Sequence, residues 1–414
     1  MNRPVREDRR ARRWRWPAGP ILALAWLSLA ASCAADGDFH VDDDDVSGDD
    51  DATGDDDTTG DDDDNPDWEG FGDDDVGTEV PTMAGPDNVK LGDLDGDGDL
   101  DAAVANMEAS NVSVLDNGGD GVLSPTAVLE VCDGVDQLAL ADLDGDGDLD
   151  LAVTCAWDDV IAVLIRGDGG FGEPVLHPCG SIPQSVAAPD LDGDGDLDLA
   201  VTLAGSDQVA VMANQGQGSF ALPETYPVGD EPGFVAPADM NGDGAPDLVT
   251  TNFSAGSVSL LLNDGAGGFP HNISHSTGGG PAGPALADLD GDGDRDVVTA
   301  NEFSDDISLL WNDGVGGLSE ATSLTMGLRP FFTAAGDLDG DGDLDLAVAM
   351  EGEGTLAILR NLGDGTFAAA ETFAAGEEPS SIALGDLDGD GDLDVVVTNY
   401  GSDSVSVYLN LATP

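Results

Sequence analysis

The sequence predicts an all-β fold made of seven copies of one unit, and three observations lead to that prediction. First, an acidic motif, Asp-x-(Asp/Asn)-Gly-Asp-Gly-x-x-Asp, occurs seven times at steps of 48 or 49 residues. Second, short runs rich in Val, Leu and Ile flank each motif and alternate with polar residues, as β-strands do. Third, no segment of the unit shows the helical period of about 3.6 residues. A fixed period of about 20–50 residues is typical of repeat architectures.

Each unit is predicted to contain four strands in the same order. A short apolar strand enters the acidic motif (NVKLGD in the first unit), and a second leaves it (LDLAV in the second unit). A third strand alternates apolar and polar residues (NVSVLDN), and a Gly-rich turn leads to a fourth, more polar strand. A proline that can begin the first strand, where its missing N–H is tolerated, stands at Pro86, Pro183, Pro232, Pro281, Pro330 and Pro379, with Val135 in its place in the second unit.

Four antiparallel strands repeated seven times predict a seven-bladed β-propeller over residues 68–414. The seventh unit ends after its third strand, whereas the segment Gly70–Val89, before the first unit, resembles Gly170–Val186 with a short acidic insertion. We therefore expect the N-terminal segment to supply the fourth strand of the seventh blade and to close the ring.

The acidic motif indicates calcium, because oxygen ligands at alternate positions and glycines that allow a sharp turn are what Ca²⁺ requires. The candidate metal ligands are Asp93, Asp95, Asp97, Asp99 and Asp101; Asp142, Asp144, Asp146, Asp148 and Asp150; Asp190, Asp192, Asp194, Asp196 and Asp198; Asp239, Asn241, Asp243, Ala245 and Asp247; Asp288, Asp290, Asp292, Asp294 and Asp296; Asp337, Asp339, Asp341, Asp343 and Asp345; and Asp386, Asp388, Asp390, Asp392 and Asp394.

The spacing, the motif and the flanking hairpins resemble the FG-GAP or VCBS repeats, the calcium-binding propeller repeats of the integrin α-chain head. The resemblance covers roughly residues 68 to 414. It implies that positions 1, 3, 5 and 9 of each motif supply side-chain ligands and that position 7 supplies a main-chain carbonyl, so that Ala245 serves as well as an aspartate there. About seven structural Ca²⁺ ions are expected.

The N-terminal residues 1–32 read as an export signal of the lipoprotein type. Arginines crowd the first fifteen residues, and the apolar stretch Ile21–Ser32 is shorter than the ~20 residues that span a bilayer. The string LAASC resembles a bacterial lipobox, although Ala30 stands where leucine is preferred, and predicts lipidation of Cys33. We expect an outer-membrane or cell-surface lipoprotein of a bacterium, held to the membrane through its lipid only. Simple secretion or a periplasmic location is the alternative.

Residues 33–67 are predicted to form an acidic, disordered tether, since they are rich in Asp, Gly and Thr and poor in apolar residues. The formal net charge of the chain is −73, and beyond the signal only Lys90, Arg166, Arg295, Arg329 and Arg360 are basic. Such a charge argues against nucleic acid and anionic membrane surfaces as partners. We expect a monomer.

Two further sets of residues are candidates for function or stability. Trp157, Phe253, Phe303 and Tyr400 follow the second strand, at the end of the unit away from the acidic motif, and could form a binding rim; the alternative is that they pack between blades. Cys132 and Cys155 are predicted to form a disulfide that leaves Cys179 free, with Cys155–Cys179 as the alternative pairing.

No catalytic constellation is recognisable, because the four histidines are scattered and the carboxylates are committed to calcium. We therefore predict a non-catalytic binding or adhesion module for a glycan or protein ligand, a lectin being its sharpest version. A polysaccharide-active hydrolase or lyase on a propeller scaffold and a purely structural envelope protein are the alternatives.

Overall fold

The computed structural model describes residues 70–71, 77–167 and 169–410. Within these residues the chain is all-β, as predicted, and contains no helix. Accordingly, the described part of the chain offers no helix that could cross a membrane. The predicted signal (1–32), the predicted tether (33–67) and Cys33 lie outside the described residues.

The first unit shows how the sequence pattern becomes a sheet. Strands β2 (Pro86–Gly92), β3 (Asp101–Asn106), β4 (Asn111–Asp116) and β5 (Ser124–Glu130) pair antiparallel in that order. Every residue of β3 is buried, whereas β5 is almost wholly exposed. The apolar second and third strands therefore lie inside the protein and the polar fourth strand faces solvent, as the sequence predicts.

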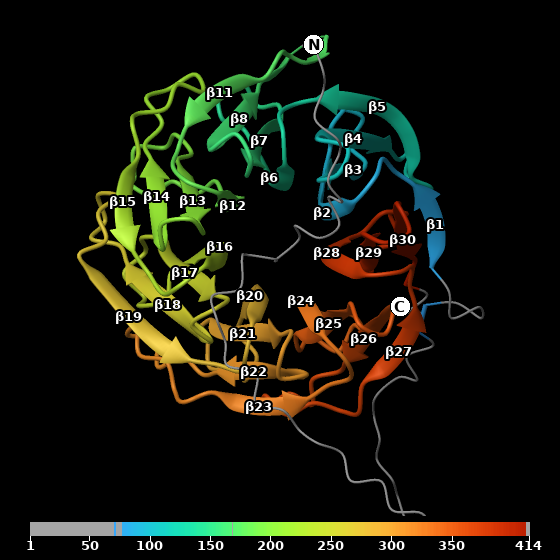
Figure 1. Cartoon of the computed structure of the whole chain (residues 1–414). Coiled ribbons are helices and arrows are strands. Elements are labelled where there is room, and N and C mark those ends of the chain that lie inside the picture. The colour runs from blue at the N-terminus through green and yellow to red at the C-terminus, as the bar shows by residue number, and fades with distance from the viewer. Residues whose placement is uncertain (1–69, 72–76, 168, 411–414) are drawn as a thin grey trace, which may run out of the picture. The chain divides into compact units, whose positions relative to one another are not determined.

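The same order recurs along the chain (Figure 1). The strands are β6 (Val135–Ala141), β7 (Asp150–Cys155), β8 (Val160–Leu164) and β11 (Val175–Pro178); β12 (Pro183–Ala187), β13 (Leu199–Leu203), β14 (Gln208–Met212) and β15 (Glu224–Pro227); β16 (Pro232–Ala238), β17 (Asp247–Asn252), β18 (Ser257–Leu262) and β19 (His271–Ser276); β20 (Pro281–Ala287), β21 (Asp296–Asn301), β22 (Asp306–Leu310) and β23 (Thr322–Thr325); β24 (Pro330–Gly336), β25 (Asp345–Met350), β26 (Thr355–Leu359) and β27 (Glu371–Ala374); and β28 (Pro379–Gly385), β29 (Asp394–Asn399) and β30 (Ser404–Tyr408). A small hairpin of β9 (Arg166–Gly167) and β10 (Gly170–Phe171) interrupts the second unit.

The last sheet is completed from the other end of the described chain. Strand β1 (Thr78–Pro81) pairs antiparallel with β30, Thr78 opposite Val407 and Pro81 opposite Ser404, so that the blue and red ends of the ribbon meet in Figure 1. The innermost strands β2, β6, β12, β16, β20, β24 and β28 contact one another in this order, and β28 also contacts β2.

The hydrophobic core is divided among the contacts between neighbouring sheets. In the described residues it forms seven clusters, one for each pair of neighbours. The cluster between the last and first sheets contains Val89 and Val104 from the first sheet and Val396 and Val405 from the last. Val80 of β1 belongs to this cluster too, so the N-terminal strand contributes apolar contacts as well as main-chain hydrogen bonds.

The contact between the fifth and sixth sheets is unusually close. A parallel pairing of Gly283 with Phe332 joins β20 to β24, so that the two four-stranded sheets form one sheet of eight strands. A Cβ atom at Gly283 would lie 2.2 Å from the Phe332 ring, which means that glycine is needed for this approach. The hydroxyl of Thr333 donates to the Gly283 carbonyl at 2.8 Å and strengthens the same junction.

One disulfide lies at the entry to the second sheet. Cys132 and Cys155 are joined, with Cα atoms 5.9 Å apart, which is the pairing favoured from the sequence. Cys179 is a buried free thiol, and burial raises its pKa to about 12, so it stays protonated at ordinary pH.

Candidate functional site

Each acidic motif fills the connection between the first and second strands of its sheet. In the first unit β2 ends at Gly92 and β3 begins at Asp101, the last residue of the motif. The loop turns sharply because Gly96 and Gly98 adopt φ values of 89° and 99°, which side chains with a Cβ rarely allow. The two glycines have positive φ in the other motifs as well.

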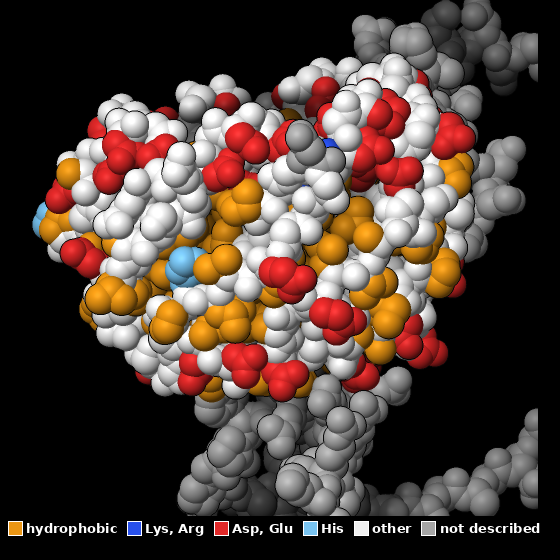
Figure 2. All heavy atoms as spheres, turned by 90° about the horizontal axis from the view of Figure 1, so that it is seen from above, with side chains coloured by type: hydrophobic (Ala, Val, Ile, Leu, Met, Phe, Trp, Pro, Cys, Tyr) orange, Lys and Arg blue, Asp and Glu red, His pale blue; other side chains and the backbone are white. Residues whose placement is uncertain are grey.

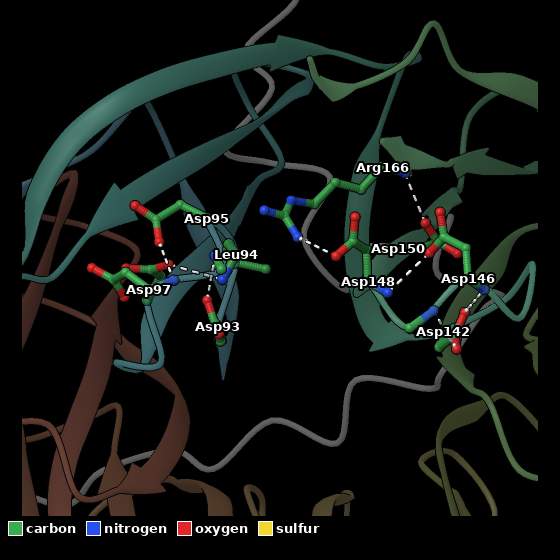
Figure 3. A network of polar contacts seen from close by, with 12 residues as sticks. Asp93, Leu94, Asp95, Asp97, Asp142, Asp146, Asp148, Asp150 and Arg166 are labelled. Atoms are coloured by element: carbon green, nitrogen blue, oxygen red, sulfur yellow. Dashed lines mark hydrogen bonds and ion pairs between the residues drawn. The ribbon is translucent and has the colours of Figure 1, made fainter. Parts of the chain in front are cut away.

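The aspartates of the motif fold the loop around their own carboxylates (Figure 3). The N–H of Gly96 donates to Asp93 Oδ1 at 2.6 Å, and that of Gly98 donates to Asp93 Oδ2 at 3.1 Å. The N–H of Asp97 donates to Asp95 Oδ1 at 3.0 Å. These bonds turn successive carboxylates toward a common centre, which is the arrangement a metal ion needs.

The ninth residue of the motif is buried and connects three parts of the sheet. Asp101 Oδ2 accepts from the N–H of Leu94 inside the loop at 2.8 Å, and its Oδ1 accepts from the N–H of Asn117, after the third strand, at 2.9 Å. The same pair of bonds is made by Asp150, Asp198, Asp247, Asp296, Asp345 and Asp394.

Burial also changes the acidity of these carboxyl groups. Desolvation raises the pKa of Asp296 and Asp394 to about 6 and that of Asp345 to about 7, against the opposing effect of the two N–H donors. The neighbouring aspartates raise each pKa further. A nearby cation would stabilise the ionised form of a carboxylate in this position.

The predicted ligands come together in compact groups. One carboxylate oxygen from each of three aspartates lies within 4.8 Å of the others in the motifs of the first, second, third, fifth and sixth units. The groups are Asp93, Asp95 and Asp101; Asp142, Asp144 and Asp146; Asp190, Asp192 and Asp194; Asp288, Asp290 and Asp296; and Asp337, Asp339 and Asp345. A set made only of oxygen ligands suits hard cations.

An asparagine that the sequence analysis missed ties each motif to its neighbour. The side-chain amide of Asn361 donates to the carbonyl of Leu344 in its own motif at 3.1 Å and to that of Leu289 in the preceding sheet's motif at 2.8 Å. Equivalent bonds are made by Asn117, Asn214, Asn263, Asn312 and Asn410. The available signal was an asparagine recurring 24 residues after the first aspartate of the motif.

The second unit has Arg166 where the others have this asparagine. Its main-chain N–H still donates to Asp150 Oδ1, at 2.7 Å. Its guanidinium lies 3.1 Å from Asp148 Oδ1 and extends toward the motif of the first unit, as Figure 3 shows. A charged side chain thus replaces the amide at the contact between the first and second motifs.

The four rim aromatics do not form one exposed belt. Trp157 and Phe303 are 37% and 66% exposed, but Phe253 and Tyr400 are only 5% and 6% exposed. Trp157 and Phe303 are therefore accessible, as a binding rim requires, whereas Phe253 and Tyr400 are buried, as packing between blades requires. The Phe253 ring packs edge-on against Phe303 with centroids 4.9 Å apart, and the Tyr400 hydroxyl bonds to Glu108 of the first unit at 3.4 Å. Aromatic residues after the second strand thus also serve contacts between sheets.

The repeated unit matches a known family of protein repeats. A family model described as the FG-GAP-like repeat matches residues 93–153, 142–201, 190–250, 239–299, 288–348 and 337–397. The chain belongs to the FG-GAP-like repeat family. Each match begins at the first aspartate of one motif and ends within the second strand of the next sheet, so it contains two acidic motifs.

Solved structures similar to this FG-GAP-like protein show a shared fold. Virginiamycin B lyase from Staphylococcus aureus has a TM-score of 0.55 at 16% identity, covering 80% of this chain and 98% of its own. Hydrazine synthase from Kuenenia stuttgartiensis has a TM-score of 0.59 at 16% identity, covering 81% and 99%. An Agrocybe aegerita lectin that recognises non-reducing terminal N-acetylglucosamine has a TM-score of 0.52 at 21% identity, covering 77% and 86%. No curated protein matches the sequence.

Proposed function

We propose that this protein is a calcium-stabilised, monomeric binding module that works outside the cytoplasm and has no catalytic activity. The observation that supports calcium is the repeated carboxylate group, in which three aspartates of one motif bring oxygens within 4.8 Å of one another. Two carboxylates about 4 Å apart repel by about 4 kcal/mol at an effective dielectric constant near 20. A divalent cation converts this repulsion into a cross-link between the first two strands of the sheet.

Calcium rather than magnesium is proposed, because the motif offers many flexible oxygen ligands and Mg²⁺ prefers to keep its waters. Each ion that binds only the folded protein adds about 2.7 kcal/mol at a free concentration one hundred times its Kd. The proposed motifs total about seven, so the melting temperature should fall by tens of degrees in EGTA and recover with Ca²⁺ but only weakly with Mg²⁺. Unchanged melting after exhaustive chelation would overturn this role.

Metal counting gives an independent check on which residues bind. We expect about seven Ca²⁺ ions per chain by elemental analysis of the desalted protein, and about one fewer in a variant that carries Asp337→Asn and Asp339→Asn. The matched control is Glu320→Gln, which removes an acidic side chain outside the motifs and should leave the count unchanged.

The proposed architecture is a closed seven-bladed propeller. It is supported by the seven clusters between neighbouring sheets, the contact of β28 with β2 and the pairing of β1 with β30. In this architecture β1 covers the buried strand β30, which would otherwise be an exposed edge that promotes aggregation.

Binding is favoured over catalysis by where the titratable side chains lie. Within the described residues the histidines are on outer strands, His177 on β11 and His271 and His275 on β19, and the motif carboxylates are assigned to metal. Figure 2 shows an edge of the molecule where Asp and Glu gather and Lys and Arg hardly appear. This surface suits neutral glycans or basic protein segments better than polyanions.

A glycan array followed by mass spectrometry of the bound sugars tests this function. Binding with no change in the mass of the sugar supports a lectin-like module, whereas product formation would support the alternative of a polysaccharide-active enzyme. If array and cross-linking experiments identify neither a glycan nor a protein ligand, the remaining alternative is a purely structural envelope role.

The proposed location rests on the sequence of the N-terminus. Lipidation at Cys33 would anchor the protein to a bacterial membrane, with onward sorting to the outer membrane or cell surface. Cys33→Ala should then move the protein from the membrane fraction to the soluble fraction. Finding the unaltered protein already soluble would favour secretion or a periplasmic location.

A further inference from the structure

A cavity of about 360 Å³ lies among the inner strands β2, β6, β12, β16, β20 and β24. Its wall presents polar and apolar surface in similar amounts, and its apolar side chains include Leu138, Phe234 and Phe332. The rings of Phe234 and Phe332 meet edge-on with centroids 5.7 Å apart. Gly283 lets the second ring approach the strand. A cavity of this size that combines apolar side chains with a few polar groups is typical of small-molecule sites.

One residue in this wall breaks the symmetry of the repeat. Lys90 is the fifth residue of the inner strand β2 and the only lysine among the 414 residues. The fifth residue of each other inner strand is alanine, at Ala139, Ala187, Ala236, Ala285, Ala334 and Ala383. A lysine where the repeat otherwise places a small side chain is not required by the packing of the unit.

The environment of Lys90 gives its ammonium group no counter-ion. Its side chain is half-buried, because the cavity admits solvent, but the surrounding strands desolvate the amine and lower its pKa. Among the residues that the structure describes, no carboxylate lies within 4.0 Å of its nitrogen. The polar side chains that share the wall, Gln137 and Ser185, are neutral.

We propose that this cavity binds a small organic carboxylate with an apolar body. Its carboxylate would pair with the ammonium of Lys90, and Gln137 and Ser185 offer hydrogen bonds beside it. Its apolar part would contact Leu138, Phe234 and Phe332. The proposal names a ligand class for the binding role proposed above and rests on that role.

The single lysine gives a direct readout of this site. Reductive methylation of the full-length, calcium-loaded protein with ¹³C-formaldehyde labels Lys90 and the N-terminal amine, and Lys90→Met identifies the first resonance. We would titrate with acetate, hexanoate and phenylacetate. Hexanoate and phenylacetate should shift the Lys90 resonance saturably with a Kd below about 1 mM, and should raise the Lys90 pKa. Acetate, which lacks an apolar body, should bind at least about tenfold more weakly.

Two variants control the experiment. Arg295→Lys adds an exposed lysine far along the sequence, whose resonance should not respond to the ligands. In Lys90→Met, binding measured by calorimetry should be lost while the melting temperature in calcium is retained, which separates loss of the site from loss of the fold.

The proposal is overturned if none of the three carboxylates moves the Lys90 resonance. It is also overturned if deleting residues 36–64 shifts that resonance in the absence of ligand, because the chain's own aspartates would then be the counter-ion. A glycan-array ligand that binds the unaltered protein and Lys90→Met equally would leave the general binding function standing and remove this site from it.

Discussion

The side-chain amide of Asn117 donates a hydrogen bond of 2.8 Å to the main-chain carbonyl of Leu387, 270 residues away in the sequence. The equivalent asparagine of the later units reaches a carbonyl only 71 or 72 residues before it. The geometry is the same in both cases, since each bond joins one sheet to the motif of its neighbour. The first and last sheets are thus joined by the chemistry used between consecutive sheets.

Removing this amide should destabilise the protein as much at the seam as elsewhere. Asn117→Ala and Asn361→Ala each leave buried carbonyls without their donor, at a cost of about 1–3 kcal/mol. Urea unfolding of both variants measures the free energy of unfolding directly. A seam that is open in solution would make Asn117→Ala nearly silent while Asn361→Ala remains costly.

The N-terminal strand should be needed for solubility as well as for stability. Deleting residues 68–84 removes β1 and exposes β30 as a sheet edge, so the protein should aggregate and melt at lower temperature. Deleting residues 36–64 is the control and should leave the melting temperature nearly unchanged. If both deletions behave alike in light scattering and calorimetry, the closed ring is wrong.

Metal-free protein should become less stable as the pH rises from about 4 to about 7. The folded-state pKa of Asp296, Asp345 and Asp394 is raised by burial to about 6 or 7, above the ordinary value of about 3.9. The folded protein then binds more protons than the unfolded chain in this range, so the stability present at low pH is lost as these groups ionise.

Melting curves in EGTA between pH 4.5 and 7.5 test this dependence, with Asp345→Asn expected to flatten it. Calcium-loaded protein should lack the effect, because the ion stabilises the ionised carboxylates. A metal-free protein whose melting temperature rises with pH would contradict the assignment.

The rim aromatics should separate into two classes. Phe253→Ala removes a buried ring and should cost about 3–5 kcal/mol of stability. Phe303→Ala and Trp157→Ala remove exposed rings and should change stability much less, while weakening a rim ligand by more than about 1 kcal/mol if they are anchors. Chemical denaturation together with binding to any array-identified ligand distinguishes the two. Equal losses of stability at Phe253 and Phe303 would assign both to packing.

The sequence was sufficient to predict the strands and the acidic loops because both follow from local patterns. Alternation, glycine and the ordered aspartates determine a strand or a loop within about ten residues. The role of the Asn361 side chain could not be predicted in this way, since its partner Leu289 lies in another sheet. An asparagine is also common in turns, so its presence there needed no further explanation. The sequence left open whether Phe253 is exposed or packed for a related reason: its burial depends on Phe303, which belongs to the next sheet.

Lys90 illustrates the opposite limit. Its position three residues before the first aspartate of the motif, where the other six units have alanine, can be read from the aligned units. The alignment does not show that the inner strands enclose a cavity at this level, which appears only when the strands are placed side by side.

The asparagine bonds connect the acidic motifs of neighbouring sheets and so offer a path by which metal binding in one motif could affect the next. The main-chain N–H of Leu387 donates to Asp394, and the carbonyl of Leu387 accepts from the side-chain amide of Asn117. The main-chain N–H of Asn117 in turn donates to Asp101. Such a relay connects the motifs of all neighbouring sheets in the described chain except the second and the first, where Arg166 replaces the amide. If metal loading is transmitted through these bonds, the seven motifs would behave as a line with two ends, and loading of the first and second motifs should be the least coupled.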